Sequence, residues 1–312
     1  MGFLSWRGMR PTRIATACAL TVCIGGFFVR ANGQAEVGPV ALPGAASGTQ
    51  ENAPPSAQSL PPTASTNAAL HEMITGVADS MQSAGIKRVA VIGGNWPITG
   101  QNALEDWLVA QVKSELGQAP YTFEVVQEKQ LTGVRNYKGP ILDLTDLDAV
   151  VSASVEPGVK GICFTLNAVT SGGPQGVSAE LSLVSRQIPL KDELAALLPA
   201  EWKQELAEGL AGDNTVPNAG NGGLSLPRCT NCGDPKYSDV ARELKLTGVV
   251  VIMATVGADA VPRDVRLVKG FGFGFDQAAI EAVSHWDFRP ARDRKGNPTA
   301  AIVTIEVTFR LL

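Results

Sequence analysis

Few side chains of this sequence have both the type and the spacing that chemistry requires. Cys229 and Cys232 form a lone Cys-x-x-Cys pair. A structural zinc ion needs four ligands, and only Cys163 and two distant histidines could supplement this pair. A redox pair normally opens a helix, whereas this one precedes Gly-Asp-Pro. We therefore expect no metal, a local disulfide between Cys229 and Cys232, and a buried free thiol at Cys163.

Other catalytic constellations are lacking in the sequence. The histidines His71 and His285 have no carboxylate at a catalytic spacing, and the motifs Gly-x-Ser-x-Gly and His-Glu-x-x-His do not occur. The loop Gly93–Trp96 follows an apolar strand as a phosphate loop would, but it lacks the Gly-Lys-Ser/Thr signature. We expect a non-enzymatic protein without a cofactor. An enzyme or ligand-binding domain with a polar pocket at this loop is a third hypothesis.

Composition and charge indicate a globular protein and argue against some function classes. The chain has 312 residues, of which 45% are hydrophobic and 18% are charged, with a net charge of −4. This composition is globular, and the charge argues against a nucleic-acid binder. The charge is unevenly distributed: residues 1–35 carry +4, residues 36–228 carry −9 and residues 229–312 carry +1. The acidity therefore lies in the middle of the chain.

The N-terminal residues 1–35 have the pattern of an export signal. Arg7, Arg10 and Arg13 precede an uncharged run over 14–29, and a small-residue stretch ends at Ala35. These features favour a secretory signal cleaved near Ala35. An uncleaved inner-membrane anchor is the alternative, since Arg30 follows the run directly. Either form places the rest of the chain in the periplasm.

Two linkers divide the exported chain. Residues 36–68 are rich in Pro, Ala, Ser and Gly, and residues 211–228 are punctuated by Gly, Asn and Pro. Between them, residues 69–210 have the pattern of an α/β domain whose role the sequence does not reveal. Residues 229–312 form the last domain.

Hydrophobic periodicity predicts the elements of the middle domain. Leu70, Met73, Ile74, Val77 and Met81 form one helix face, and Leu104, Leu108, Val112 and Leu116 form another. Thr145, with Asp148 three residues later, predicts a helix that continues through Ala149 and Val150. Strands are expected over 87–94, 121–127, 161–169 and 176–186, and a helix over 191–208.

The last domain shows the clearest pattern. Ser238 is expected to cap a helix that ends at Leu244, and Asp276 to cap a helix with apolar residues at 279, 282, 283 and 286. A strand over 249–256 and one over 263–268 form a hairpin. In the final strand Val303, Ile305, Val307, Phe309 and Leu311 alternate with polar residues. The fold class predicted is α+β: a small C-terminal antiparallel sheet with helices, preceded by a separate α/β domain.

These residues resemble a known family. The segment Tyr237–Leu312 looks like the C-terminal domain of TonB energy-transducing proteins, although Ser238 stands where the family usually has Pro. The resemblance is carried by Leu246–Val250, Val256-Gly257, Asp264-Val265, three glycines at 270, 272 and 274, and the run from Trp286 to Ala291. The residues expected to define this fold are Tyr237, Gly248, Gly257, Asp276, Trp286, Phe288 and Pro290.

The resemblance implies a periplasmic domain that binds outer-membrane TonB-dependent receptors. In the family the partner adds a strand beside the domain's last strand, where unpaired N–H and C=O groups can complete a ladder. The resemblance also implies energy transduction from an inner-membrane proton-driven motor complex. The expected partner-binding residues are Ile302, Val303, Thr304, Ile305, Glu306, Val307, Thr308, Phe309 and Arg310. The outward side chains Thr304, Glu306, Thr308 and Arg310 are expected to tune specificity.

A second hypothesis comes from a different class of protein. The chain would then be a soluble periplasmic scaffold or envelope-assembly factor, in which residues 69–210 recognise the partner and residues 229–312 only dock. The middle segment resembles, at the level of pattern alone, periplasmic α/β domains of the FlgO and CsgG type. Processing of the N-terminus separates the hypotheses, because a cleaved chain has no direct link to an inner-membrane motor.

Overall fold

The computed structural model describes residues 64–94, 102–127, 144, 146–172, 178–189, 192–210 and 216–311. These residues all belong to one compact unit, Ala57–Leu312. The expected export signal and most of the first linker lie outside the described residues. In the part of the chain that is described, no helix is long and apolar enough to cross a membrane.

The first half of the large unit begins with predicted elements. Helix α1 (Ala64–Ser83) buries all five apolar residues of its predicted face, and α2 (Ala103–Leu116) buries all four of its own. The Asn102 side chain caps α2 by accepting the N–H groups of Leu104 and Glu105. Strands β1 (Arg88–Gly93) and β2 (Glu124–Val126) lie within the segments expected to be extended. Helix α1 begins before residue 69, so the first linker is shorter than predicted.

The helix expected through Ala149 and Val150 is wrong. These residues begin strand β3 (Ala149–Gly158), which is buried along its whole length. Asp148 does not cap a helix: its carboxylate accepts the backbone N–H groups of Lys87 and Arg88, which lead into β1. A strand buried on both faces has no polar alternation, so periodicity could not distinguish it from a buried helix.

The remaining elements of this half follow the prediction in part. Strands β4 (Gly161–Thr170) and β5 (Glu180–Ile188) are confirmed, and they pair antiparallel. The helix expected over 191–208 is two helices, α4 (Asp192–Leu197) and α5 (Ala200–Leu210). Pro199 separates them, since proline cannot donate the hydrogen bond that a continuing helix needs.

The C-terminal half contains the predicted order of helix, strand, strand, helix and strand. Its principal elements are α6 (Asp239–Glu243), β7 (Gly248–Val256), β8 (Pro262–Lys269), α7 (Phe275–Ser284) and β12 (Ala301–Phe309). Ser238 caps α6 as predicted, by accepting the N–H of Ala241. One short helix and four short strands were not predicted: η2 (Asn221–Gly223), β6 (Arg228–Asn231), β9 (Asp287–Arg289), β10 (Ala291–Arg292) and β11 (Pro298–Thr299).

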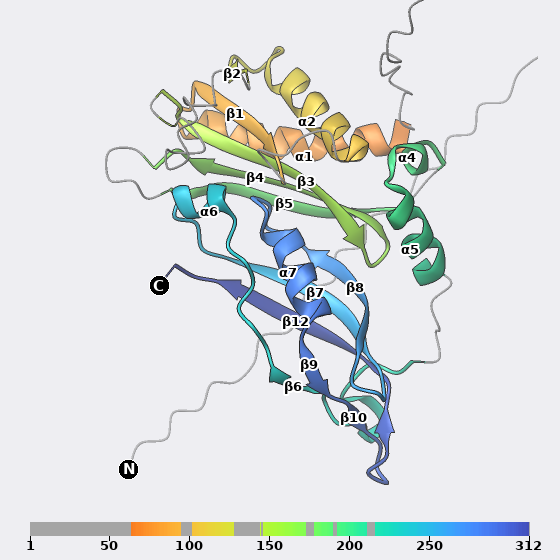
Figure 1. Ribbon diagram of the computed structural model, residues 1–312. Coiled ribbons are helices and arrows are strands. Elements are labelled where there is room, and N and C mark those ends of the chain that lie inside the picture. The colour runs from red at the N-terminus through yellow and green to blue at the C-terminus, as the bar shows by residue number, and fades with distance from the viewer. Residues whose placement is uncertain are drawn as a thin grey trace, which may run out of the picture. The chain divides into compact units, whose positions relative to one another are not determined.

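The two halves share one mixed sheet with the order β12-β7-β8-β3-β1-β2, and β4 and β5 continue from β3. Strands β12, β7 and β8 are antiparallel, as expected for the C-terminal part. A parallel bridge between Gly158 and Leu267 joins β3 to β8. Figure 1 shows α1 and α2 on one side of β1, β3, β4 and β5, and α6 and α7 on the other.

Two hydrophobic cores lie on opposite faces of this sheet. The first is formed by α1 and α2 against residues such as Val91 and Val151. The second combines the opposite face of the same strands, including Ile92 and Val150, with α6, α7 and β7. The described residues therefore form one large mixed sheet and do not clearly show a separate α/β domain, because the middle segment covers one sheet face with its own helices and the other with the C-terminal half.

A buried polar joint fastens the halves together at the Gly-rich segment 270–274. From the middle strands, the Ser152 hydroxyl accepts the N–H of Phe273 and the Asn167 amide donates to the carbonyl of Phe271. The Ser185 hydroxyl accepts the N–H of Gly270. Because buried polar groups need partners, these residue types specify this docked position of the loop.

Asp276 belongs to this joint and not to a helix cap, which corrects the prediction. Gly274 is the N-cap residue of α7, in the left-handed conformation with φ of 80°. The Asp276 carboxylate accepts the N–H groups of Phe271 and Gly272 and the hydroxyl of Ser154 from β3. Its side chain is fully buried, and this burial raises its pKa against the opposing effect of those donors.

Candidate partner-binding edge

Strand β12 is the outer strand of the C-terminal part of the sheet. Its whole length pairs antiparallel with β7, with Thr304 opposite Met253 and Val307 opposite Val250. The outer side of β12 therefore presents backbone groups that β7 does not use. An extended segment placed there could complete a second ladder.

Residues before β6 already use one position of this edge. Ile302 donates its N–H to the carbonyl of Pro217 at 3.0 Å, and its carbonyl accepts the N–H of Ala219 at 2.8 Å. We call residues 217–219 the strap. This segment lies in the predicted linker 211–228, and no side-chain pattern in the sequence pointed to its pairing.

The strap also fixes the direction of each backbone group. The groups of Ile302 point away from β7, and in an antiparallel ladder this direction alternates along the strand. Thr304, Glu306 and Thr308 therefore point outward, whereas Val303, Ile305 and Val307 pair with β7. In the described part of the chain no further backbone bond reaches the outer side of 304–308.

The side chains of β12 alternate as the sequence predicted. Val307 and Phe309 are buried, and Val303 and Ile305 are half-buried. The side chains of Thr304, Glu306, Thr308 and Arg310 are exposed. The four residues expected to tune specificity thus share one exposed face, and three of them also direct their backbone groups outward.

The opposite edge of the C-terminal strands is covered. The carbonyl of Leu267 in β8 accepts the N–H of Val159 and the side-chain amide of Gln187, which also reaches the carbonyl of Val268. All these donors come from the middle segment. Between the two edges of the three-stranded part, β12 is the one that remains open to a partner along most of its length.

A surface hollow of about 400 Å³ lies at the C-terminal end of this edge. Val249 and Leu311 in its lining are exposed by 40% and 39%, which is high for large apolar side chains. A strand added along β12 would reach this hollow, where an apolar side chain could be buried. The lining residues are Thr247, Gly248, Val249, Thr308, Phe309, Arg310 and Leu311.

Aromatic rings support β12 from beneath. Phe309 stacks on Phe275 of α7 with ring centroids 4.0 Å apart, and Tyr237 meets Phe275 edge-on at 4.9 Å. Gly248 in β7 lies directly against Phe271, so a larger residue there would collide with its ring. Tyr237 and Gly248 therefore act on the position of β12 through the core.

The other residues expected to define the fold make contacts in turns and between short strands. Gly257 closes the β7–β8 turn by donating to Val261 and accepting from Ala260. Trp286 follows α7 and donates its indole N–H to the carbonyl of Gly233. Phe288 is buried in β9 and Pro290 is half-buried beside it. Trp286, Phe288 and Pro290 all lie outside β12, and their contacts are those of structural residues.

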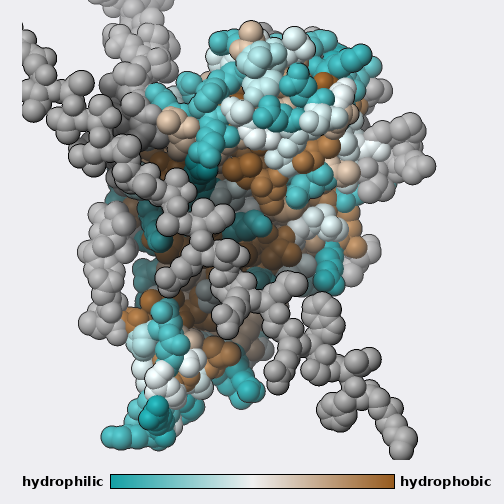
Figure 2. Space-filling view, turned by 180° about the vertical axis from the view of Figure 1, so that it is seen from behind, coloured by the Kyte–Doolittle hydropathy of each residue, from teal (hydrophilic) through white to brown (hydrophobic). Residues whose placement is uncertain are grey.

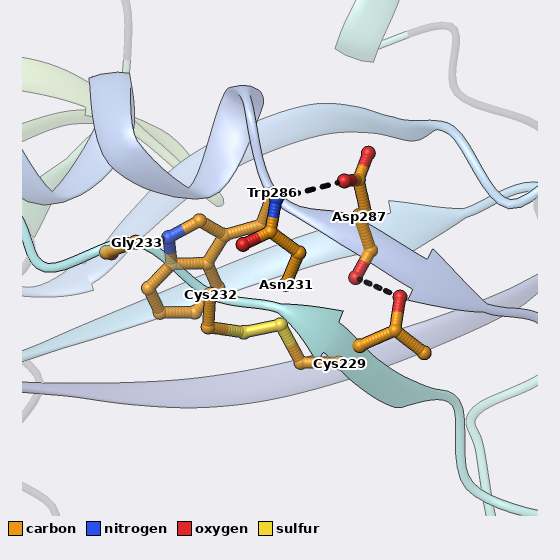
Figure 3. The surroundings of a disulfide bond; sticks show 7 residues. Cys229, Asn231, Cys232, Gly233, Trp286 and Asp287 are labelled. Carbon is orange, nitrogen blue, oxygen red and sulfur yellow. Dashed lines mark hydrogen bonds between the residues drawn. A yellow bond between two sulfur atoms is a disulfide. The ribbon is translucent and has the colours of Figure 1, made fainter.

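The Cys-x-x-Cys pair forms a disulfide between Cys229 and Cys232. Figure 3 shows it beside Trp286 and the contacts that join β6 to β9. Among them, the Asn231 amide donates to the Asp287 carboxylate and the Thr230 hydroxyl donates to the Asp287 carbonyl. The disulfide thus closes a short loop at the end of β6, where the chain enters the C-terminal domain.

The remaining candidates for chemistry lie apart from the edge. Cys163 is a buried free thiol, and desolvation raises its pKa to about 11. His71 contacts Glu115 on α2, and His285 contacts the carbonyl of Glu281 at the end of α7. The described residues contain no cluster of three metal ligands. The loop expected to signal a ligand pocket is described only as far as Gly94.

Comparison with known proteins agrees with the C-terminal architecture. Residues 233–311 match the family described as Gram-negative bacterial TonB protein C-terminal. The search of curated proteins returned no match. The similarity of the middle segment to FlgO and CsgG domains stays a prediction. The chain thus carries, at residues 233–311, a TonB C-terminal domain, a type of domain that belongs to the cell envelope and has no enzymatic role.

Proposed function

We propose that this chain is a periplasmic TonB-type protein that binds an outer-membrane receptor by strand addition along β12. The supporting observation is a difference between the two edges of the C-terminal strands. Val159 and Gln187 cover the outer side of β8, whereas the outward backbone groups of Thr304, Glu306 and Thr308 have no backbone partner among the described residues. Backbone pairing supplies affinity in this mode, and alternate side chains supply specificity.

The test uses adjacent proline substitutions in the full exported chain and a panel of receptor plug peptides. Thr304→Pro removes an outward N–H and should weaken peptide binding by at least about tenfold, while the β7 ladder stays intact. Thr304→Ala keeps the N–H and should bind as the unaltered protein does. Unchanged binding by a folded Thr304→Pro variant would contradict strand addition at this edge.

Ile305→Pro is the matched structural control. Its N–H points toward β7, so proline there removes a ladder bond inside the sheet and should lower the free energy of unfolding by about 1–3 kcal/mol. The two substitutions therefore separate an effect on the edge from an effect on the sheet. Circular dichroism melting of both variants provides the comparison.

We further propose that the domain transmits energy for transport from an inner-membrane proton-driven motor. This step requires the anchor form of residues 1–35. Mass spectrometry of the protein from its native envelope identifies the N-terminal residue directly, and an intact Met1 in the inner-membrane fraction would support this step. A mature start near Glu36 in the soluble periplasm would instead support the scaffold hypothesis.

A further inference from the structure

Arginines from separate segments meet at one end of the C-terminal domain. A hollow of about 560 Å³ is lined by Arg228 in β6, Arg289 in β9 and Arg292 in β10. Figure 1 places these strands at the end of the domain away from α1 and α2, and this end is mostly hydrophilic in Figure 2. The other lining residues are Ser225, Leu226, Pro227 and Pro290. The fold therefore places three positively charged side chains around one hollow, which we call the arginine hollow.

The cross-strand register makes this arrangement costly. Arg228 and Arg289 are direct partners in the antiparallel β6–β9 pair, so their side chains project from the same face. Like charges placed directly opposite each other destabilise a strand pair. An unfavourable pair such as this one, whose cost no other contact in the fold offsets, is typical of residues that serve in binding.

Nearby acids do not neutralise these arginines. Among the described residues, no carboxylate forms an ion pair with any of the three. Asp287 accepts the Asn231 amide, and Asp293 is occupied within its turn by Asn297 and the N–H of Lys295. The Arg292 guanidinium donates one bond to the carbonyl of Gly296, which positions it without removing its charge.

The strands that hold the arginines are fastened. The disulfide begins at Cys229, next to Arg228, and the Ser225 hydroxyl accepts the N–H of Arg292. Pro227 and Pro290 have fixed φ angles on either side of the hollow. These contacts restrain the backbone around the hollow, whereas the three arginine side chains are exposed.

We propose that this arginine hollow binds a phosphate group. Three guanidinium groups match a phosphate monoester, which carries close to two negative charges and three acceptor oxygens, better than a single carboxylate of an acidic peptide. Leu226 stands at the rim with 62% of its surface exposed, where an apolar neighbour of the phosphate would lie. The phosphate belongs to an anionic lipid headgroup or to a soluble phosphate compound.

Two arms distinguish these sources in the full exported chain. The first measures co-sedimentation with phosphatidylcholine vesicles with and without phosphatidic acid. The second measures inorganic phosphate binding by calorimetry. Binding only to vesicles that contain phosphatidic acid identifies a lipid headgroup, and binding to inorganic phosphate alone identifies a soluble ligand. Binding in neither arm, or binding of an acidic Glu-rich peptide in place of both, overturns the proposal.

Substitution localises the effect. Arg228→Gln with Arg289→Gln should weaken binding by about 25-fold, at roughly fivefold for each charge. Lys160→Gln removes an exposed charge in the middle segment and is the control that should bind normally. Equal losses in both variants would mean unspecific charge attraction and would contradict a site. Since the double substitution relieves the like-charge pair, its melting temperature should equal or exceed that of the unaltered protein.

Discussion

At the residue scale, Asp276 is the side chain whose environment is most unusual. Its carboxyl is fully buried between β3 and the segment 270–274, and burial raises its pKa. The folded protein therefore binds this proton more tightly than the unfolded chain does. The corresponding contribution to stability is complete below the ordinary pKa of about 4 and is lost as the pH rises through the folded pKa.

Asp276→Asn removes this titration. We expect the free energy of unfolding of the unaltered protein, relative to that of the variant, to fall as the pH rises from about 4 to about 7. Asp148 and Asp293, whose pKa values are lowered by backbone and side-chain hydrogen bonds, remain in both proteins and cancel in the difference. Urea unfolding at a series of pH values measures it. A difference that rises with pH would contradict the assigned effect of burial.

Cys163 offers a second prediction at this scale. Because desolvation raises its pKa to about 11, very little thiolate exists near neutral pH. We expect iodoacetamide to alkylate Cys163 at least about 100-fold more slowly in the folded protein than in urea. Peptide mapping by mass spectrometry reports this residue separately from the other cysteines. Rapid alkylation under native conditions would show that β4 opens readily.

At the element scale, the strap is the feature that most affects the candidate edge. Ala219→Pro removes the donor to the Ile302 carbonyl, and we expect the free energy of unfolding to fall by about 1 kcal/mol. The Ile302 amide, which donates to Pro217, should then exchange its hydrogen faster. Asn218→Ala is the control, because it changes an exposed side chain and keeps the backbone donors. Unaltered exchange at Ile302 in the proline variant would show that the strap does not protect the edge.

How far the sequence predicted each element depended on its exposure. Strand β12 and helix α2 each have one exposed and one buried face, so the spacing of their apolar residues predicted both elements correctly. Strand β3 is buried on both faces and was mistaken for a helix because Thr145 and Asp148 imitate a capping pattern. The strap and the Arg228–Arg289 pair depend on long-range register, which no local pattern encodes. The open edge was therefore predictable, whereas its partial cover and the arginine hollow were not.

At the scale of the whole described unit, the central question is whether the middle segment and the TonB C-terminal domain unfold together. The second core takes residues from both, and the joint around Asp276 crosses between them. If the middle strands lost the C-terminal half, the sheet face that carries Ile92 and Val150 would meet water. We therefore expect one cooperative transition.

A reciprocal pair of core substitutions tests this expectation. Leu108→Ala removes a buried side chain from α2, which touches only the first core, and should lower the free energy of unfolding by about 2–5 kcal/mol. In a single cooperative unit, the slowest amides of β7 should lose as much protection from hydrogen exchange as those of β1. Val307→Ala in β12, which belongs to the second core, should likewise reduce protection in β1. If each substitution loosened only its own half, the C-terminal domain would unfold independently of the middle segment despite the sheet that they share. Equal losses would instead mean that the two halves unfold as one unit, so that a partner bound at β12 would be coupled to the middle segment through the shared sheet.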